Sequence, residues 1–146
     1  MDKTEARIRL AIDAMGSDLG PSEVLEGVAQ AIDRSPWNTE FVLFGQEEII
    51  EPLITSHSIL SRSKVEFVHS PEVVGMEEKP IAGIKGKKKS SMSLALEALK
   101  EGEADALLSC GNTGCLMAGG AIKLRTLDGV ERPALCTIWP GRERYF

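Results

Sequence analysis

The sequence predicts an α/β protein in which a largely parallel sheet lies between layers of helices. Short apolar runs alternate with helical patterns four times along its 146 residues, as in chains built from strand–helix–strand units. Clusters of turn-forming residues follow the expected strands. The composition is 42% hydrophobic and 27% charged, which indicates a globular protein with a buried core rather than a disordered chain.

Five short apolar runs are expected to form the strands of the sheet. They lie at residues 7–13, 40–44, 64–69, 104–110 and 133–139. The fourth run, ADALLSC, has the continuous apolar character of a strand that is buried on both faces. Since parallel strands are joined by right-handed crossovers, we expect helices on both sides of the sheet.

Four helices are expected between these strands. They lie at about residues 21–34, 46–56, 91–101 and 115–125. Pro52 should kink or split the second helix. Ser90 or Ser91 can cap the third helix. Gly119 and Gly120 weaken the fourth helix but allow close packing against a neighbour.

Three loops are expected at the carboxyl ends of the strands, where ligands bind in an open parallel sheet. They are residues 13–20, 70–89 and 111–114, and they are the segments richest in Gly, Asp, Asn, Ser and Lys. Residues 70–89 show no strong periodicity, which predicts a long irregular loop with a functional role or high mobility. Position and composition therefore indicate the same edge of the sheet as a binding site.

Each loop allows a ligand-binding and a structural interpretation. In the first, Asp13, Gly16 and Asp18 suit either close backbone approach to a ligand or a tight turn with capping carboxylates. It lacks the G-x-G-x-x-G pattern of dinucleotide-binding loops. The turn around Asn112 offers neutral donors at a helix start, which suit a tetrahedral anion or a capped turn. The basic run at residues 85–89 suits an anion or a solvated surface.

Overall charge and cysteine spacing exclude several classes of function. The chain has 17 Lys and Arg against 22 Asp and Glu, so its net charge of −5 gives no support for nucleic-acid binding. It begins without an apolar leader and has no run long enough to cross a bilayer, which predicts a cytoplasmic protein. Cys110, Cys115 and Cys136 have no metal-type spacing and are expected to be reduced, small buried side chains. No metal and no cofactor are expected.

Five stretches of the sequence resemble the PlsX family of phosphate acyltransferases. They are IDAMGSDLGP at residues 12–21, VVGMEEKP at 73–80, KKKSSM at 87–92, EGEADALLSCGNTGCLMA at 101–118 and RPAL at 132–135. Their order and spacing are those of the family. The chain departs from the family pattern at Ser17, Leu19 and Lys89, where the family usually has glycine, histidine and aspartate. A role for a histidine in the first loop is therefore not available here.

The resemblance implies a Rossmann-like fold of the isopropylmalate dehydrogenase and phosphotransacylase type. It implies transfer of a fatty acyl group from acyl carrier protein to inorganic phosphate, giving acyl phosphate for phospholipid synthesis by a PlsY-type acyltransferase. Since family members are more than twice as long, residues 1–146 would form the N-terminal portion of one domain. The family also implies a homodimer and, at full length, peripheral membrane contact.

This chemistry assigns expected roles to residues in all three loops. Because phosphate is itself an anionic nucleophile, the site must mainly hold it and stabilise the developing oxyanion. The expected phosphate ligands are Ser90, Ser91, Asn112, Thr113 and Gly114. The expected catalytic residues are Lys79, Lys88 and Asn112. Asp13, Gly16 and Asp18 are expected to order the loops or contact substrate, and the lysine run can also meet the acidic carrier protein.

Two other classes of function fit the same sequence. The chain can be an inactive fragment or a scaffold half-domain, in which case it would show little or no transferase activity. It can also belong to a coenzyme A-dependent phosphotransacetylase-like enzyme or to a dehydrogenase of the isopropylmalate type, which also lacks the glycine fingerprint.

Overall fold

The computed structural model describes residues 7–34, 38–63 and 65–136. The strands in this part of the chain are β1 (Ile8–Asp13), β2 (Thr39–Gly45), β3 (Val65–His69) and β4 (Ala106–Ser109). The helices are α1 (Pro21–Arg34), α2 (Glu47–Ser56), α3 (Pro80–Gly86), α4 (Ser91–Lys100) and α5 (Thr113–Lys123), with a short 3-10 helix, η1 (Leu60–Arg62), before β3.

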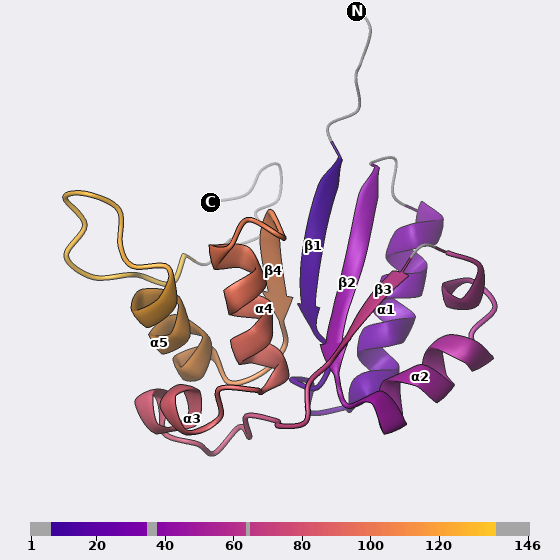
Figure 1. Ribbon diagram of the computed structural model, residues 1–146, viewed down its shortest axis with the longest axis horizontal. Helices are drawn as coiled ribbons and strands as arrows, with labels where there is room; N and C mark the ends of the chain where they lie inside the picture. The colour runs from indigo at the N-terminus through magenta and orange to yellow at the C-terminus, as the bar shows by residue number, and fades with distance from the viewer. Residues whose placement is uncertain (1–6, 35–37, 64, 137–146) are drawn as a thin grey trace, which may run out of the picture.

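The four strands form one parallel sheet in the order β3-β2-β1-β4 (Figure 1). The register places Asp13, at the end of β1, opposite Phe44 in β2 and Ser109 in β4. The chain leads from β1 to β2 and β3 on one side and then returns to place β4 on the other side of β1. The strand order therefore reverses between β1 and β4, which is where doubly wound sheets bind their ligands.

Helices cover both faces of the sheet, which confirms the expected three-layer α/β/α architecture. On one face, α1 and α2 pack on alternate strand residues such as Ile12 and Leu43. On the other face, Ala95 and Ala98 of α4 pack against the intervening strand residues, which point the opposite way, such as Val42. This alternation follows from the two-residue period of side chains along a strand.

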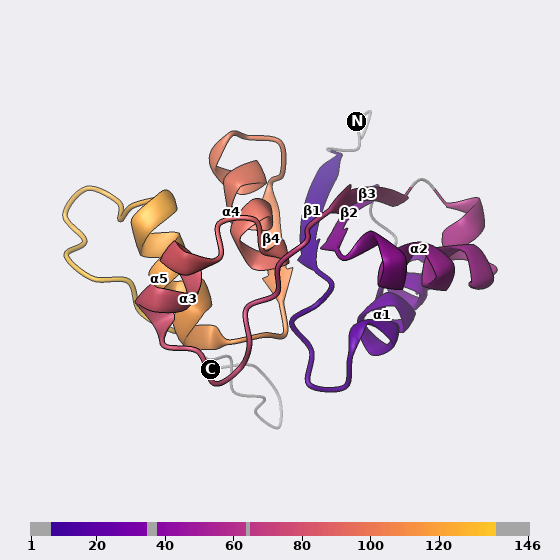
Figure 2. The ribbon, with the colours of Figure 1, turned by 60° about the horizontal axis from the view of Figure 1, so that its bottom comes forward.

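A third group of helices extends the α4 layer. Helix α3 and helix α5 lie side by side next to α4 in both ribbon views (Figures 1 and 2). Their shared core contains Ile84, Leu96 and Cys115. A Cβ atom at Gly119 would lie 2.4 Å from Leu96 Cδ1, so this glycine permits the close packing that was predicted, whereas Gly120 faces open space.

Most expected elements are confirmed, but residues 70–89 are not a continuous loop. They contain α3, which begins at Pro80 in the first helical position, where proline has no hydrogen bond to lose. Only Gly83 and Ile84 of this short helix are buried, so its apolar period was too brief to stand out in the sequence. Helix α5 also begins earlier than expected, at Thr113.

Four further expectations were wrong in detail. The strand expected to be buried on both faces, β4, lies at the edge of the described sheet and alternates exposed and half-buried residues. Pro52 does not split α2, because it lies on the exposed side, where water can reach the carbonyl that its missing N–H leaves free. Residues 133–136 form no strand, and residues 137–139 lie outside the described residues. Of the three cysteines, Cys115 is buried as expected, while Cys110 and Cys136 are exposed.

None of the helices in the described ranges has both the length and the apolar character needed to span a membrane.

Candidate functional site

The loops that follow β1 and β4 meet at the point where the strand order reverses. Figure 2 turns this carboxyl edge of the sheet toward the viewer. Gly16 and Gly111 approach so closely that a Cβ atom on Gly16 would lie 2.9 Å from the Gly111 nitrogen. Any larger residue at Gly16 would force the two loops apart. The predicted loop-ordering role of Gly16 thus has a geometric basis in this contact.

Asp13, the last residue of β1, links the same two loops through hydrogen bonds. Its side chain is buried, and its Oδ2 accepts a hydrogen bond from the Ser109 hydroxyl at 2.7 Å. The hydroxyl oxygen of Ser109 accepts in turn from the Gly111 N–H at 3.1 Å. The other carboxylate oxygen of Asp13 accepts from the Met15 N–H at 3.3 Å. Asp13 is therefore committed to holding the loops, while Asp18 is exposed.

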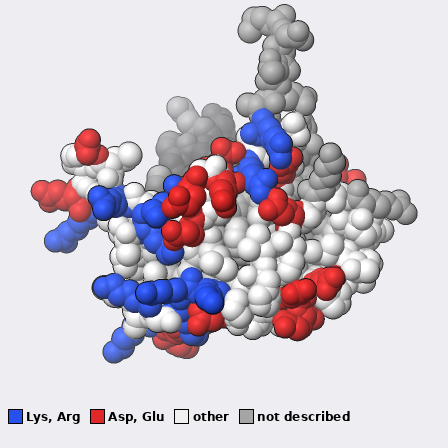
Figure 3. Space-filling view, viewed as in Figure 1, with Lys and Arg blue, Asp and Glu red and all other residues white. Residues whose placement is uncertain are grey.

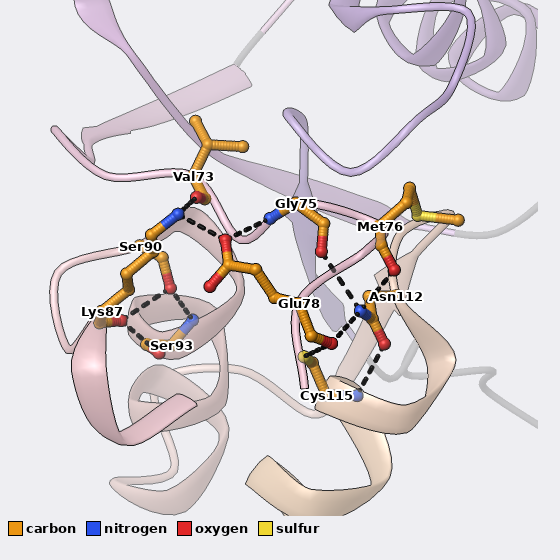
Figure 4. A network of polar contacts seen from close by, with 9 residues as sticks. All are labelled: Val73, Gly75, Met76, Glu78, Lys87, Ser90, Ser93, Asn112 and Cys115. Carbon is orange, nitrogen blue, oxygen red and sulfur yellow. Dashed lines mark hydrogen bonds and ion pairs between the residues drawn. The ribbon is translucent and has the colours of Figure 1, made fainter. Parts of the chain in front are cut away.

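Asn112 ties the start of α5 to the loop that precedes α3 (Figure 4). Its Oδ1 accepts from the Cys115 N–H at 3.0 Å, which caps the helix. Its Nδ2 donates to the carbonyl oxygens of Gly75, Met76 and Glu78 at 3.1, 2.8 and 3.0 Å. The side chain is 8% exposed. Its hydrogen-bonding groups are thus fully used inside the protein.

Glu78 and Lys87 close the same loop from the other side (Figure 4). The Glu78 carboxylate accepts from the Gly75 N–H at 2.8 Å and forms an ion pair with Lys87. Lys87 also donates to the Val73 carbonyl at 2.6 Å. The hydrogen bond from Gly75, followed by that from Lys87, lowers the pKa of Glu78 below its ordinary value. Lys87 therefore orders the loop.

The start of α4 is enclosed by the protein. Ser90 caps the helix, since its hydroxyl oxygen accepts from the Ser93 N–H at 3.3 Å while its O–H donates to the Lys87 carbonyl at 2.9 Å. Ser90 and Ser91 are both buried, and the Ser91 N–H donates to the Glu72 carbonyl at 3.2 Å. The Glu72 carboxylate accepts from the Lys89 N–H at 2.8 Å. A carboxylate of the protein thus already lies beside this helix start.

The start of α5 is open by comparison. Among the described residues, no acceptor contacts the backbone N–H groups of Thr113 and Gly114, and Thr113 is exposed. A Cβ atom on Gly114 would lie 2.8 Å from Pro80 Cγ, so the start of α5 abuts the start of α3. Lys79, the residue before Pro80, is exposed at this junction. The junction of α3 and α5, here called the corner, therefore holds the exposed Thr113 side chain and two N–H groups without an acceptor among the described residues, and Lys79 precedes Pro80 beside it.

The structure separates Lys88 from this corner. Lys88 lines a groove between α3, α4 and α5, together with Ile84, Leu94 and Ile122. In the described ranges there is no group of three His, Cys, Asp or Glu side chains placed to hold a metal ion.

Sequence reasoning missed the acidic side chains that organise the site. Of the two adjacent glutamates Glu77 and Glu78, neither was assigned a role from the sequence; Glu77 is exposed, while Glu78 accepts a hydrogen bond from the Gly75 N–H and pairs with Lys87. Glu72 had not been considered at all. Two adjacent glutamates differ only in which one the folded loop turns inward, so the sequence pattern contained no signal that distinguished them.

Comparison with known proteins shows where this architecture belongs. A family model described as "Fatty acid synthesis protein" matches residues 8–145. A phosphate acyltransferase of Azorhizobium caulinodans is 48% identical over 136 residues, which cover 92% of this chain and 38% of the relative. A phosphate acyltransferase of Levilactobacillus brevis is 39% identical over 137 residues, which cover 94% of this chain and 38% of the relative.

These matches confirm the resemblance to phosphate acyltransferases, although the chain spans only 38% of the length of these two relatives. The family-model match extends over nearly all of the sequence, including all four strands and the loops between them. The chain therefore belongs to the fatty acid synthesis protein family.

Proposed function

We propose that this chain supplies the phosphate-binding corner of a phosphate acyltransferase, which moves a fatty acyl group from acyl carrier protein to inorganic phosphate. The observation that carries the proposal is the open start of α5 at the point where the strand order reverses. There the N–H groups of Thr113 and Gly114 have no acceptor among the described residues. A helix start of this kind attracts anions through its free N–H groups and its dipole.

The corner suits phosphate better than the start of α4 does. At α4 the Glu72 carboxylate accepts from the Lys89 backbone, and Ser90 and Ser91 are buried. A second anion there would meet a negative charge. At α5 no carboxylate of the described residues contacts the open N–H groups, and the exposed residue Lys79 precedes Pro80, which abuts Gly114. We therefore assign phosphate contact to Thr113 and Gly114, charge neutralisation to Lys79, and positioning to Asn112.

The transfer needs no strong general base in this arrangement. A phosphate oxygen attacks the carbonyl carbon of the acyl thioester, a C–O bond forms, and the C–S bond breaks. The thiolate leaves on the carrier protein and takes up a proton. We assign to Lys79 the stabilisation of negative charge that develops on the carbonyl oxygen, because it is the exposed basic residue next to the junction of α3 and α5. The product, an acyl phosphate, would be consumed by an acyl-phosphate:glycerol-3-phosphate acyltransferase of the PlsY type.

The names of the relatives favour this reaction over the coenzyme A-dependent and dehydrogenase alternatives. Residues 1–146 are proposed to form the N-terminal portion of a single catalytic domain. The homodimer, the cytoplasmic location and the peripheral membrane contact stay predictions.

Phosphate binding can be measured on this chain directly. Inorganic phosphate should raise its melting temperature relative to chloride at equal ionic strength, because a ligand that binds only the folded state stabilises it. Thr113→Val keeps the shape of the side chain but removes its hydroxyl, and should weaken phosphate binding about tenfold. Equal melting temperatures in phosphate and chloride would contradict the phosphate site.

Acyl transfer can be measured in a chimera. This chain would replace the matching part of the Azorhizobium caulinodans relative, to which it is 48% identical. We expect the chimera to release free thiol from acyl carrier protein only when phosphate is present, and Lys79→Gln to reduce that rate at least tenfold. Thiol release that does not depend on phosphate would contradict the proposed reaction.

A further inference from the structure

A groove of about 420 Å³ lies between α3, α4 and α5, outside the phosphate-binding corner. Its apolar lining comes from one residue of each helix: Ile84, Leu94 and Ile122. Ile122 is 46% exposed and borders the other apolar side chains of the groove, so the apolar surface there is contiguous. Figure 3 shows an uncharged surface on the left of the molecule, between a mixed group of red and blue side chains above it and a row of blue side chains below it.

The charged lining of the groove is predominantly basic. It consists of Lys85, Lys88, Lys123 and Glu97. Glu97 is already paired with Lys123 and Lys100. Within the described residues, Lys85 and Lys88 are exposed and make no ion pair. Two positive charges, which pair with no carboxylate of the described residues, therefore lie beside an exposed apolar strip.

A second apolar surface continues from the groove along α3. It is lined by Lys79, Pro80, Ile81, Ala82 and Lys85, and Lys85 belongs to both surfaces. Ile81 is 59% exposed. Helix α3 has seven residues, so the surface runs for about 10 Å, from the groove to the phosphate-binding corner at Lys79. A partner seated on α3 would thus lie next to the place where phosphate is proposed to bind.

We propose that this α3 surface is the docking site for the acyl-carrying partner, and that the partner presents an acidic helix with apolar side chains between its carboxylates. Carboxylates would pair with Lys85 and Lys88, and apolar side chains would cover Ile81 and Ile122. This inference rests on the proposed function, in which the acyl donor is a carrier protein. The docking site places the thioester within reach of Lys79, and its charge increases the rate of encounter.

The test measures binding of acyl carrier protein to this chain by fluorescence anisotropy at low and at high salt. Lys85→Glu should weaken binding at least tenfold at low salt and less at high salt, because salt screens exposed charges. Ile122→Glu should also weaken binding at least tenfold, because it places a carboxylate beside the apolar lining. Arg34→Glu is the matched control, since Arg34, like Lys85, is a basic residue in the last turn of a helix. Because α1 covers the other face of the sheet, this control should leave the affinity unchanged.

Phosphate-dependent melting temperatures of the same variants separate this inference from the proposed function. If phosphate stabilises every variant while Lys85→Glu and Ile122→Glu bind the carrier as tightly as the unaltered chain, the docking site is wrong and the phosphate site stands. If phosphate stabilises none while carrier binding depends on Lys85, the docking site stands and the phosphate site is wrong. Self-association through this surface, seen in sedimentation and abolished by Ile122→Glu, would also overturn the docking site.

Discussion

Both the oxygen and the nitrogen of the Asn112 side-chain amide form hydrogen bonds within the protein. It caps α5 through Oδ1 and holds three carbonyl oxygens of the preceding loop through Nδ2. The sequence indicated a phosphate ligand at this position, because asparagine at a helix start offers a neutral donor. The folded chain directs that donor toward residues 75–78 instead. Asn112 therefore shapes the corner in which Thr113 and Gly114 remain open.

Replacement of Asn112 tests this positioning role. Asn112→Ala should lower the free energy of unfolding by about 2 kcal/mol, because a helix cap is lost and three part-buried carbonyl oxygens lose their donor. Asn112→Asp keeps the capping oxygen but places a carboxylate against three carbonyl oxygens, so it should destabilise the protein at least as much near neutral pH. Urea unfolding measures both. A stability unchanged in Asn112→Ala, with phosphate binding lost, would instead favour a direct phosphate ligand.

The three cysteines differ in reactivity because only one of them is buried. Burial, followed by the nearby Glu78 carboxylate, raises the pKa of the Cys115 thiol. Cys110 and Cys136 are exposed. In the native protein, a maleimide should label Cys110 and Cys136 rapidly and Cys115 only after unfolding. Mass spectrometry of the labelled peptides measures the order, and rapid native labelling of Cys115 would contradict the described packing.

At the scale of elements, the close packing of α5 against α3 and α4 depends on the absence of a side chain at Gly119. Gly119 faces Leu96 and Ile84, whereas the neighbouring Gly120 faces open space. Two adjacent glycines with the same helix propensity thus have different packing environments. Neither the glycine pair nor the helix pattern indicated which of the two lies against α4.

The pair Gly119→Ala and Gly120→Ala is a matched test of this packing. At Gly120 the added methyl group meets nothing and should stabilise the protein by about 0.5–1 kcal/mol through helix propensity. At Gly119 the methyl group would overlap Leu96, and overpacking of about 1–3 kcal/mol should exceed that gain. Thermal unfolding should therefore rank Gly120→Ala above the unaltered protein and Gly119→Ala below it. The opposite order would show that α5 packs on another face.

At the scale of the whole molecule, the α3–α4–α5 layer is built on an apolar core and carries two ion pairs at its surface. Glu78 pairs with Lys87, and Glu97 in α4 pairs with Lys123 in α5. The pKa of Glu78 is lowered by the Gly75 N–H and Lys87, and that of Glu97 by Lys123 and Lys100. A carboxyl group with a lowered pKa in the folded state stabilises the protein above its unfolded pKa, which is near 4.5 for glutamate.

The stability that these two carboxylates provide should therefore be lost as the pH falls from about 4.5 through their folded pKa values. The double variant Glu78→Gln/Glu97→Gln should be less stable than the unaltered protein at neutral pH, and its stability should fall less on acidification. Urea unfolding at several pH values measures the slope. Glu103→Gln, an exposed position without an ion pair among the described residues, is the control. Parallel slopes for all three proteins would contradict the role of the pairs.

Four of the five predicted strands and all four predicted helices were recovered because their signals are local. Residues 7–13 form β1 within one residue, and Ser90 caps α4 as expected. Helix α3 was missed because a seven-residue helix with two buried positions shows almost no period. The strand order, with β4 beside β1, depends on contacts between residues almost one hundred positions apart, such as Asp13 and Ser109.

The sequence by itself determined the fold class, the family and the edge of the sheet where polar loops gather, because apolar periodicity and motif order are properties of neighbouring residues. Only the tertiary structure decided which polar groups at that edge remain open to a ligand. Asn112, Ser90 and Lys87 make hydrogen bonds within the protein, while Thr113, Gly114 and Lys79 donate none among the residues that the structure describes. The physical reason is that each donor binds the acceptor that folding brings nearest, and those acceptors come from other segments of the chain.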